Sequence, residues 1–409
     1  FYPFSSDDGF AVVDYKRIKK EHGDWIDLKR ISKKFKIMTD LVINHCSSQN
    51  KLFKNFLVKK SPGNDFFISS KKEFDNFSKV VRPRESKLSK EVKINGEKIY
   101  VWCTFSHDQV DFDFKNPNVL IYFVKLIKFY LDQGVNALRL DAVAFLWKKK
   151  GTKCINLTQT HLIIRLIRLL IESYSRNCLI ITETNIPNHE NLSYFGNNNE
   201  AHCIYNFSFA PLVIHAIISE NNVYLKKWSR SMPPAQFGNS YLNFLSTHDG
   251  IGMRPLEGLL PEVELKRFIK TLESSGAYLT HRVSGKKKSV YEVNTTLLDA
   301  FKQTYRGKDD LAINRFVLAH EILFCMEGIP AIYIQNLIGS KNDNRKFKIN
   351  KKFRSVNRRN WDFEELTDLL IQENSVNYKA YNSITKLLKL RKKQPAFHPN
   401  ATQFTLQLP

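Results

Sequence analysis

The chain has 409 residues, of which 43% are hydrophobic and 30 are Phe, so it can bury a substantial core and is not a disordered polymer. No apolar run approaches the ~20 residues of a transmembrane helix, so we expect no membrane partner that the chain would enter through such a helix. The formal charge of +23 is spread along the whole chain without a helix-turn-helix, zinc-finger or RNA-binding signature, so we expect no nucleic-acid partner.

The six cysteines are scattered, with no CxxC pair and no His cluster at metal-ligand spacing. This usage is typical of a reduced compartment, so we expect a cytoplasmic protein with no metal site. The first residues, which start at Phe1, do not have the pattern of a secretory signal. Nothing in the composition indicates an oligomeric state.

Apolar, β-rich runs alternate with helical patterns along the chain. Strands are expected at 35–44, 135–143, 177–185, 202–209, 241–249 and 328–334. Helices are expected at 116–134, 160–174, 311–326 and 381–393. The first of these helices has the clearest limits, with Asn116 as its cap, Pro117 in its first turn and Gly134 as its terminator.

Strands separated by helices predict parallel pairing, either in a barrel or in an open doubly wound sheet. No Gly-rich phosphate loop follows a strand, which argues against a nucleotide-binding sheet. We count six strands, or seven if 1–3 is the end of another. The expected fold is therefore an α/β fold, a (β/α)8 TIM barrel that lacks its first strand and most of its second.

Three of the expected strands end in an acid. Asp141 closes "ALRLDA", Glu183 closes "LIITETN" and Asp249 closes "FLSTHDG", while "TDLVINH" ends in His45. Each alone has an ordinary structural explanation, as a turn residue, a helix cap or a core histidine. Because barrel enzymes place their active sites at the carboxyl ends of their strands, we expect these residues to share one site. Paired carboxylates are what retaining glycoside chemistry needs.

The segments "DLVINH", "ALRLDAVAF", "IITETN" and "FLSTHDG" resemble, in this order, the four sequence regions of glycoside hydrolase family 13, the α-amylase family. "FYPFSSDDGFAVVDY" and "THDGIGMRPLEGLL" resemble its sucrose phosphorylase subfamily, which includes glucosylglycerate phosphorylase-like members. The resemblance covers essentially the whole chain. It implies a retaining transfer of glucose from a small α-glucoside to inorganic phosphate as co-substrate, with no metal and no organic cofactor.

The resemblance also implies roles for single residues. Asp141 would be the nucleophile, Glu183 the general acid/base and Asp249 the stabiliser of the transition state. Arg139 would hold Asp141 ionised.

Four further residues would bind the substrate, according to the same resemblance. His45 and His248 would contact the bound glucose. Asp7 in "SSDDGF" and Arg358 in "SVNRR" match the pair that closes the blind end of the glucose pocket.

Two segments depart from the pattern of sucrose-specific members. "ETN" at 183–185 and "YEVN" at 291–294, the acceptor-loop residues Tyr291 and Glu292 among them, are more similar to relatives acting on glucosylglycerate. A carboxylate at Glu292 is expected to repel phosphate or an anionic acceptor unless Lys286–Lys288 or another cation compensates its charge. The donor stays open between sucrose, sucrose phosphate and glucosylglycerate, with sucrose placed first.

The expected domain organisation follows the family. Residues 1–49 would be the truncated start of the catalytic barrel, 50–105 an inserted subdomain, 106–395 the rest of the barrel with an acceptor loop at about 275–305, and 396–409 the start of a missing β domain. Three alternatives remain: a family 13 hydrolase or transglucosidase, an inactive truncated fragment, and a nucleic-acid binder.

Overall fold

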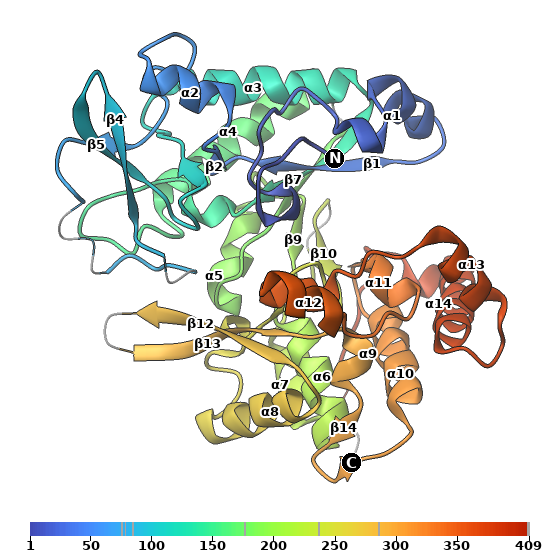
Figure 1. Cartoon of the computed structure of the whole chain (residues 1–409). Coiled ribbons are helices and arrows are strands. Elements are labelled where there is room, and N and C mark those ends of the chain that lie inside the picture. Colours follow the sequence, from blue (N-terminus) through green and yellow to red (C-terminus); the bar gives the residue numbers. More distant parts are fainter. Residues whose placement is uncertain are drawn as a thin grey trace. The chain divides into compact units, whose positions relative to one another are not determined.

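The computed structural model describes residues 1–74, 77, 79–83, 86–175, 177–235, 238–284 and 287–406. These residues form two compact units, each with its own internal contacts (Figure 1). The first consists of 1–184, 193–204 and 282–289, and the second of 185–192, 205–281 and 290–409. Strands β9, β12 and β13 have residues in both units.

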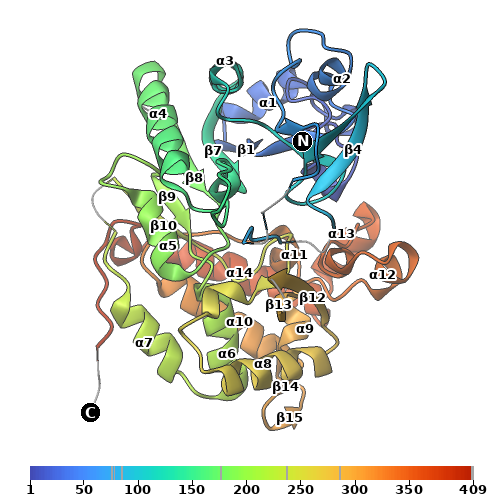
Figure 2. The same cartoon turned by 90° about the vertical axis from the view of Figure 1, so that its left-hand side faces the viewer.

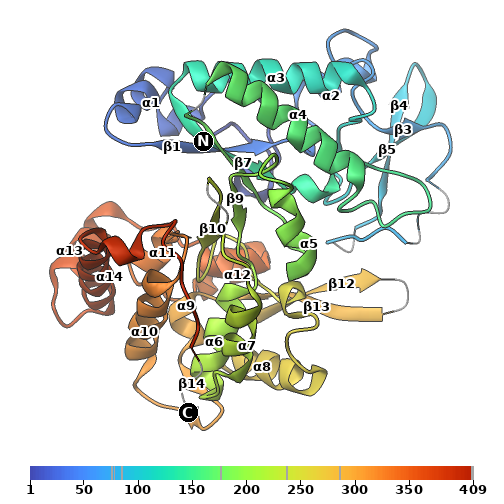
Figure 3. The same cartoon turned by 180° about the vertical axis from the view of Figure 1, so that it is seen from behind.

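The first unit is built on parallel strands joined by helices. Strands β1 (Ile37–Val42), β7 (Val135–Asp141), β8 (Leu179–Thr182) and β9 (Cys203–Tyr205) pair in that order, all parallel. Helices α3 (Pro117–Asp132) and α4 (Thr158–Tyr174) precede β7 and β8 and lie side by side (Figures 1 and 3). The remaining elements of this unit are η1 (Asp7–Gly9), η2 (Lys20–His22), α1 (Trp25–Ser32), β2 (His45–Ser47), α2 (Lys51–Leu57), β3 (Ser69–Ser70), β4 (Ser89–Ile94), β5 (Glu97–Trp102), β6 (Gln109–Asp111), η3 (Val143–Phe145) and η4 (Ser193–Phe195).

Local signals explain the limits of α3. The side chain of Asn116 accepts a hydrogen bond from the backbone N–H of Asn118, Pro117 occupies the first turn, and Gly134 follows with φ +92°. These are the start and stop signals expected from the sequence. The chain then enters β7 directly, which brings Asp141 to the end of a buried strand.

An aromatic cluster joins the N-terminal segment to the end of β1. Tyr2 stacks on Tyr130 with ring centroids 5.9 Å apart, and Tyr15 meets Phe123 edge-on at 5.9 Å. The Tyr15 hydroxyl is within 2.8 Å of the carbonyl oxygens of Val42 and His45. This packing fixes the backbone that carries His45.

The stretch expected as an insertion, 50–105, contains α2 and a three-stranded antiparallel sheet in the order β3-β5-β4 (Figure 3). Trp102 at the end of β5 packs against Phe74 and Phe77, with ring centroids 5.1 and 4.8 Å away. The structure places this stretch within the first compact unit.

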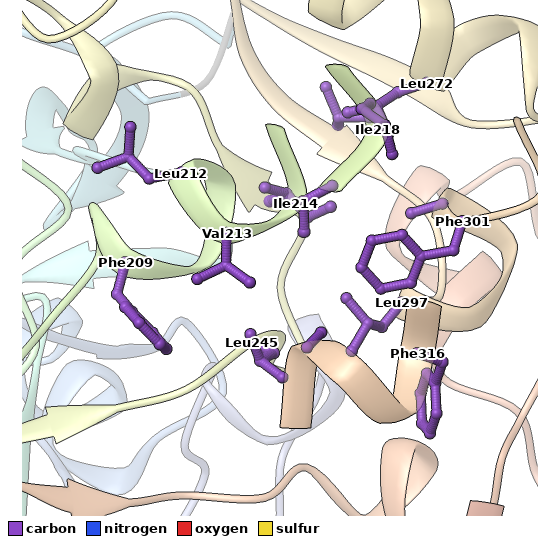
Figure 4. Packing of buried hydrophobic residues seen from close by; sticks show 14 of the residues in the cluster. Phe209, Leu212, Val213, Ile214, Ile218, Leu245, Leu272, Leu297, Phe301 and Phe316 are labelled. Carbon is purple, nitrogen blue, oxygen red and sulfur yellow. The ribbon is translucent and has the colours of Figure 1, made fainter. Parts of the chain in front are cut away.

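The second unit surrounds the buried helix α6 (Phe209–Ser219), which packs against α7 (Val223–Ser231) and α10 (Ala312–Cys325; Figures 1 and 2). Figure 4 shows Phe209, Val213 and Leu245 facing one another beside Phe301 and Phe316 from the helical segments that follow. Full burial of such side chains contributes about 1.5–3 kcal/mol each.

Strands β10 (Ser240–Asn243) and β16 (Ile329–Pro330) of the second unit pair in parallel. The other elements of this unit are α5 (Asn188–Leu192), β11 (Ile251–Gly252), η5 (Arg254–Leu256), α8 (Glu262–Ser274), β12 (Tyr278–Ser284), β13 (Lys287–Asn294), α9 (Leu297–Ala300), β14 (Gln303–Thr304), β15 (Gly307–Lys308), α11 (Ile334–Leu337), α12 (Asn344–Asn350), η6 (Phe353–Asn357), α13 (Phe363–Ile371), α14 (Val376–Lys392) and η7 (Pro395–Phe397).

All six expected strand regions contain a parallel strand, but several strands are shorter than expected. The region 202–209 is a strand only over Cys203–Tyr205, and α6 starts at Phe209. In the region 241–249 the strand ends at Asn243, and the residues that follow form a loop. Among the residues that the structure describes, no helix is both long and apolar enough to cross a membrane. The six cysteines are free thiols, and all except Cys325 are buried.

Candidate active site

The ends of β7 and β8 bring two carboxylates together in the first unit. Asp141 is the last residue of β7, and Glu183 directly follows β8. The strands are paired in register from Ala137 with Leu179 to Leu140 with Thr182, and the Glu183 N–H donates to the Leu140 carbonyl at 3.2 Å. Parallel pairing therefore places both acids at the same edge of the sheet, as the sequence predicts.

One guanidinium lies between these acids. Arg139 Nη1 is 2.8 Å from Asp141 Oδ1 and 2.6 Å from Asp40 Oδ1, and Arg139 Nη2 is 3.8 Å from Glu183 Oε2. Arg139 and Asp141 are buried, whereas the side chain of Asp40 is 39% exposed. The expected contact of Arg139 with Asp141 is present, and Asp40 is a third acid that sequence reasoning missed.

The backbone after Asp141 holds Glu183 in place. The N–H of Ala142 donates to Glu183 Oε2 at 2.9 Å. Ala142 has left-handed backbone angles, φ 50° and ψ 28°, which cost a residue with a Cβ atom about 1–2 kcal/mol. The strained turn thus directs a backbone donor from the end of β7 at the acid on β8.

Burial and neighbouring charges act on Asp141 in opposite directions. Burial raises the pKa of this carboxyl well above its ordinary value, Arg139 opposes the rise, and the charges of Glu183 and Asp40 add to it. Burial therefore opposes the ionisation of Asp141, and Arg139 supplies the positive charge that a carboxylate at Asp141 needs.

His45 follows β1 and has partners for both ring nitrogens. Asn44 Nδ2 lies 3.1 Å from His45 Nδ1, and His45 Nε2 lies 3.0 Å from both the Phe10 carbonyl oxygen and Gln109 Nε2. Burial lowers the pKa of His45, so the neutral ring is favoured. With Nδ1 accepting from Asn44, the Nε2–H donates to the Phe10 carbonyl.

A buried ion pair supports Asn44. Lys148 Nζ is 2.6 Å from Asp111 Oδ2 and 2.7 Å from Asn44 Oδ1, and Asn44 Nδ2 donates to Asp111 at 3.0 Å. Thr104 completes the coordination of Asp111 through its N–H and hydroxyl. Sequence reasoning missed this pair, which joins positions 37 residues apart, a separation that no local pattern reveals.

Asp7 is the first residue of η1, in a loop segment that is held by a second acid. It adopts φ +55°, and Gln109 Nε2 is 3.3 Å from its Oδ2. The neighbouring Ser5 and Ser6 hydroxyls donate to Asp108 Oδ2 at 2.5 and 2.6 Å. Burial raises the pKa of Asp108, but the surrounding serine hydroxyls outweigh burial and lower it below its usual value. An ionised Asp108 thus anchors the loop that carries Asp7.

In the second unit, His248 and Asp249 do not end a strand, contrary to expectation. They lie on the loop between β10 and β11, and the segment that includes η6 fixes this loop. Asn357 Nδ2 donates to the carbonyl oxygens of Thr247 and Asp249 at 3.1 and 2.8 Å, and Arg358 Nε donates to that of His248 at 2.6 Å. Backbone groups that no strand partner satisfies are thereby paired.

The Asp249 carboxylate lies beside two guanidinium groups and one imidazole ring. Its Oδ1 is 2.5 Å from Arg354 Nη1, 3.4 Å from Arg358 Nη2 and 3.7 Å from His248 Nε2. Arg354 was not predicted, although it stands four residues before Arg358 in "FRSVNR", a spacing that places two arginines on one side of a helical turn.

Glu292 does not project from a loop, contrary to expectation. It lies in β13, is 1% exposed, and forms a two-pronged ion pair with Arg354, Nε to Oε2 at 3.1 Å and Nη2 to Oε1 at 2.6 Å. Its neighbour Tyr291 is buried, and its carbonyl accepts the Met253 N–H at 3.0 Å. Arg354 is thus a cation that compensates the charge of Glu292. Lys286 lies outside the described residues, as do the side chains of Lys287 and Lys288.

The pair expected from Asp7 and Arg358 joins residues of the two different units, and it stays a prediction. The same holds for Asp249 in one site with Asp141 and Glu183. Within the described ranges, no group of three or more His, Cys, Asp or Glu side chains is arranged to hold a metal ion.

Comparison with known proteins identifies the family. Residues 1–251, more than half of the chain, match the model of the α-amylase catalytic domain. The chain belongs to the α-amylase family. Its (β/α)8 fold has the parallel sheet described above, and Asp141 and Glu183 lie within the matched α-amylase region.

Individual relatives narrow the comparison within the α-amylase family. The chain is 39% identical to the glucosylglycerate phosphorylase of Escherichia coli, over 99% of this chain and 73% of that protein. It is 26% identical to the sucrose phosphorylase of Bifidobacterium adolescentis, over 94% of this chain and 77% of that protein. The crystal structure of a sucrose 6F-phosphate phosphorylase from Thermoanaerobacter thermosaccharolyticum superposes with a TM-score of 0.86 at 26% identity, covering 97% of this chain and 80% of that one.

Proposed function

We propose that the protein is a retaining α-glucoside phosphorylase, a glycosyltransferase that moves glucose from a small α-glucoside to inorganic phosphate. The observation that carries the proposal is the pair of carboxylates, Asp141 and Glu183, held by one buried guanidinium at the ends of adjacent parallel strands. The curated relatives named as phosphorylases support the acceptor.

The proposed reaction is a double displacement. An oxygen of Asp141 attacks the anomeric carbon, the bond from this carbon to the leaving oxygen breaks, and Glu183 gives that oxygen its proton. A phosphate oxygen then attacks the same carbon, the ester bond to Asp141 breaks, and the phosphate proton returns to Glu183. The product is α-glucose 1-phosphate, and Asp249 stabilises the positive charge on the sugar in both transition states.

The arrangement around Arg139 supports Asp141 as the nucleophile and Glu183 as the proton donor. The guanidinium lies within hydrogen-bond distance of Asp141 but 3.8 Å from Glu183, so it favours the negative charge on Asp141. In the proposed first step, Glu183 is the group that gives its proton to the leaving oxygen. His45, His248 and the Asp7–Arg358 pair would bind the glucose, and Tyr291 and Glu292 would border the acceptor.

Glucosylglycerate is the donor that we propose first, in place of sucrose. Three relatives named glucosylglycerate phosphorylase are 37–39% identical to this chain, whereas the named sucrose phosphorylases are 26% identical. The "ETN" and "YEVN" segments agree with this ranking.

The test is an assay of glucose 1-phosphate with purified protein, inorganic phosphate and either glucosylglycerate, sucrose or sucrose 6F-phosphate. Release that requires phosphate, fastest with glucosylglycerate, is the expected result. Fastest release from either sucrose donor would overturn the choice of donor alone. Free glucose formed at a rate independent of phosphate would instead favour a family 13 hydrolase.

A further inference from the structure

Arg354 occupies a position in the second unit that connects two acids of different kinds. One edge of its guanidinium is fully used by the buried Glu292 of β13, through Nε and Nη2. The remaining nitrogen, Nη1, is 2.5 Å from Asp249 Oδ1. A planar guanidinium held at two points by one carboxylate has little freedom left, so the direction of its third nitrogen is set.

Glu292 can hold Arg354 because it is itself fixed. Its residue is paired with Gly252 across the β11–β13 ladder, and a Cβ atom built on Gly250 would lie 2.9 Å from the Glu292 Cβ. The loop that carries Asp249 thus crosses β13 at close range, which a larger residue than Gly250 would prevent. Backbone packing and the ion pair act on the same loop.

We propose that Arg354 is a positioning residue, which Glu292 orients so that it fixes the Asp249 carboxylate for the transition state. The inference rests on the proposed function, because it takes Asp249 as the stabilising acid. Glu292 then acts as the counter-ion of Arg354 and does not repel the incoming phosphate. It contributes to catalysis through Arg354 and Asp249.

A merely structural role for Arg354, as the partner of a buried carboxylate, makes a different prediction. Breaking a buried pair leaves an uncompensated charge and destabilises a protein strongly, whereas removing both partners is much milder. The double variant R354Q/E292Q therefore separates the two roles. It restores stability in either case, but it restores activity only if Arg354 does nothing beyond neutralising Glu292.

The experiment compares R354Q, R354K, E292Q and R354Q/E292Q by thermal unfolding and by kcat and KM for phosphate. R354Q is expected to lower Tm by several degrees and kcat on the order of 10- to 100-fold, the effect of a small misplacement of a catalytic group. R354K keeps the positive charge but lacks the planar guanidinium that binds Glu292 at two points, so it should also have a low kcat. The double variant should regain Tm while kcat stays low.

The matched control is R359Q in the same segment. Arg359 pairs with the exposed Glu365 and lies over the ring of Trp361, so its loss should change neither Tm nor kcat appreciably. Recovery of kcat together with Tm in the double variant would overturn the proposal. So would an increase in KM for phosphate with kcat unchanged in R354Q, which would make Arg354 an anion ligand.

Failure of the proposed function is distinguishable from failure of this inference. An aryl α-glucoside reports the glucosyl-transfer step with water as acceptor, whatever the natural acceptor is. If the unchanged protein cleaves this donor but forms no glucose 1-phosphate, the phosphorylase proposal fails, and the same variants still test Arg354 on the aryl donor.

Discussion

At the scale of single residues, each unit has a candidate site in which one arginine contacts more than one carboxylate. Arg139 contacts Asp40 and Asp141 and approaches Glu183, and Arg354 connects Asp249 with Glu292. A shared guanidinium fixes the distance between acids more firmly than separate ion pairs would, because its nitrogens are held in one plane.

Loss of Arg139 should shift the pH dependence of the first step. In R139Q, burial and the charges of Glu183 and Asp40 raise the pKa of Asp141 with nothing to oppose them. Because Asp141, the proposed nucleophile, must be ionised to attack, the acidic limb of kcat/KM for the donor should move to higher pH. D40N, which removes a charge that raises this pKa, should move the limb to lower pH. An unmoved limb in R139Q would contradict the role of Arg139.

The two carboxylates should respond differently to conversion into amides. D141N should abolish turnover, since an amide does not form the glucosyl ester. E183Q should be slowed by roughly 100-fold or more with natural donors but partly rescued with α-glucosyl fluoride, whose leaving group needs no proton. The measurement is the rate of each variant with both donors. If either variant were as active as the unchanged protein with a natural donor, the assignment of the two roles would be refuted.

At the scale of elements, a close backbone contact fixes the position of β16 against β10 in the second unit. Gly328, between α10 and β16, has φ +104°, and a Cβ atom there would lie 2.5 Å from the Tyr241 carbonyl oxygen of β10. Only glycine combines this conformation with this contact. Register between β10 and β16 thus depends on a residue without a side chain.

The variant G328A should lower the free energy of unfolding by clearly more than G307A does. Gly307 has a similar φ of +115° but nothing within 4 Å of a built Cβ, so G307A measures the conformational strain alone, about 1 kcal/mol. The difference between the two, measured by urea unfolding, isolates the clash with Tyr241. Equal effects would show that the contact relaxes without cost.

Elements with strong local signals were predictable from the sequence, and contacts between distant residues were not. The limits of α3 are set by residues next to the helix in the sequence, and Asp141 and Glu183 stand directly at the ends of apolar runs. Arg354 meets an acid 62 positions away and another 105 positions away, which no local pattern reveals. The loop position of Asp249 escaped prediction because "YLNFLSTHD" continues as an apolar run beyond the end of β10.

At the scale of the whole molecule, the formal net charge is +23, and the residues around Arg139 and Arg354 do not account for it. Arg139 and Arg354 face four acids, Asp141, Glu183, Asp249 and Glu292, so these six residues carry no excess of positive charge. The excess is therefore carried by lysines along the rest of the chain. Such a field attracts phosphate over long distances and says nothing about specificity.

The rate of capture of phosphate should consequently depend on salt. Raising the ionic strength from about 10 mM to about 150 mM shortens the screening length from about 30 Å to about 8 Å. We expect kcat/KM for phosphate to fall several-fold, while kcat/KM for a neutral donor such as an aryl α-glucoside changes little. The two constants are measured on the same protein in the same salt series. An equal fall for the neutral donor would show that salt acts on the fold or the chemistry, because a neutral molecule feels no attraction from the net charge.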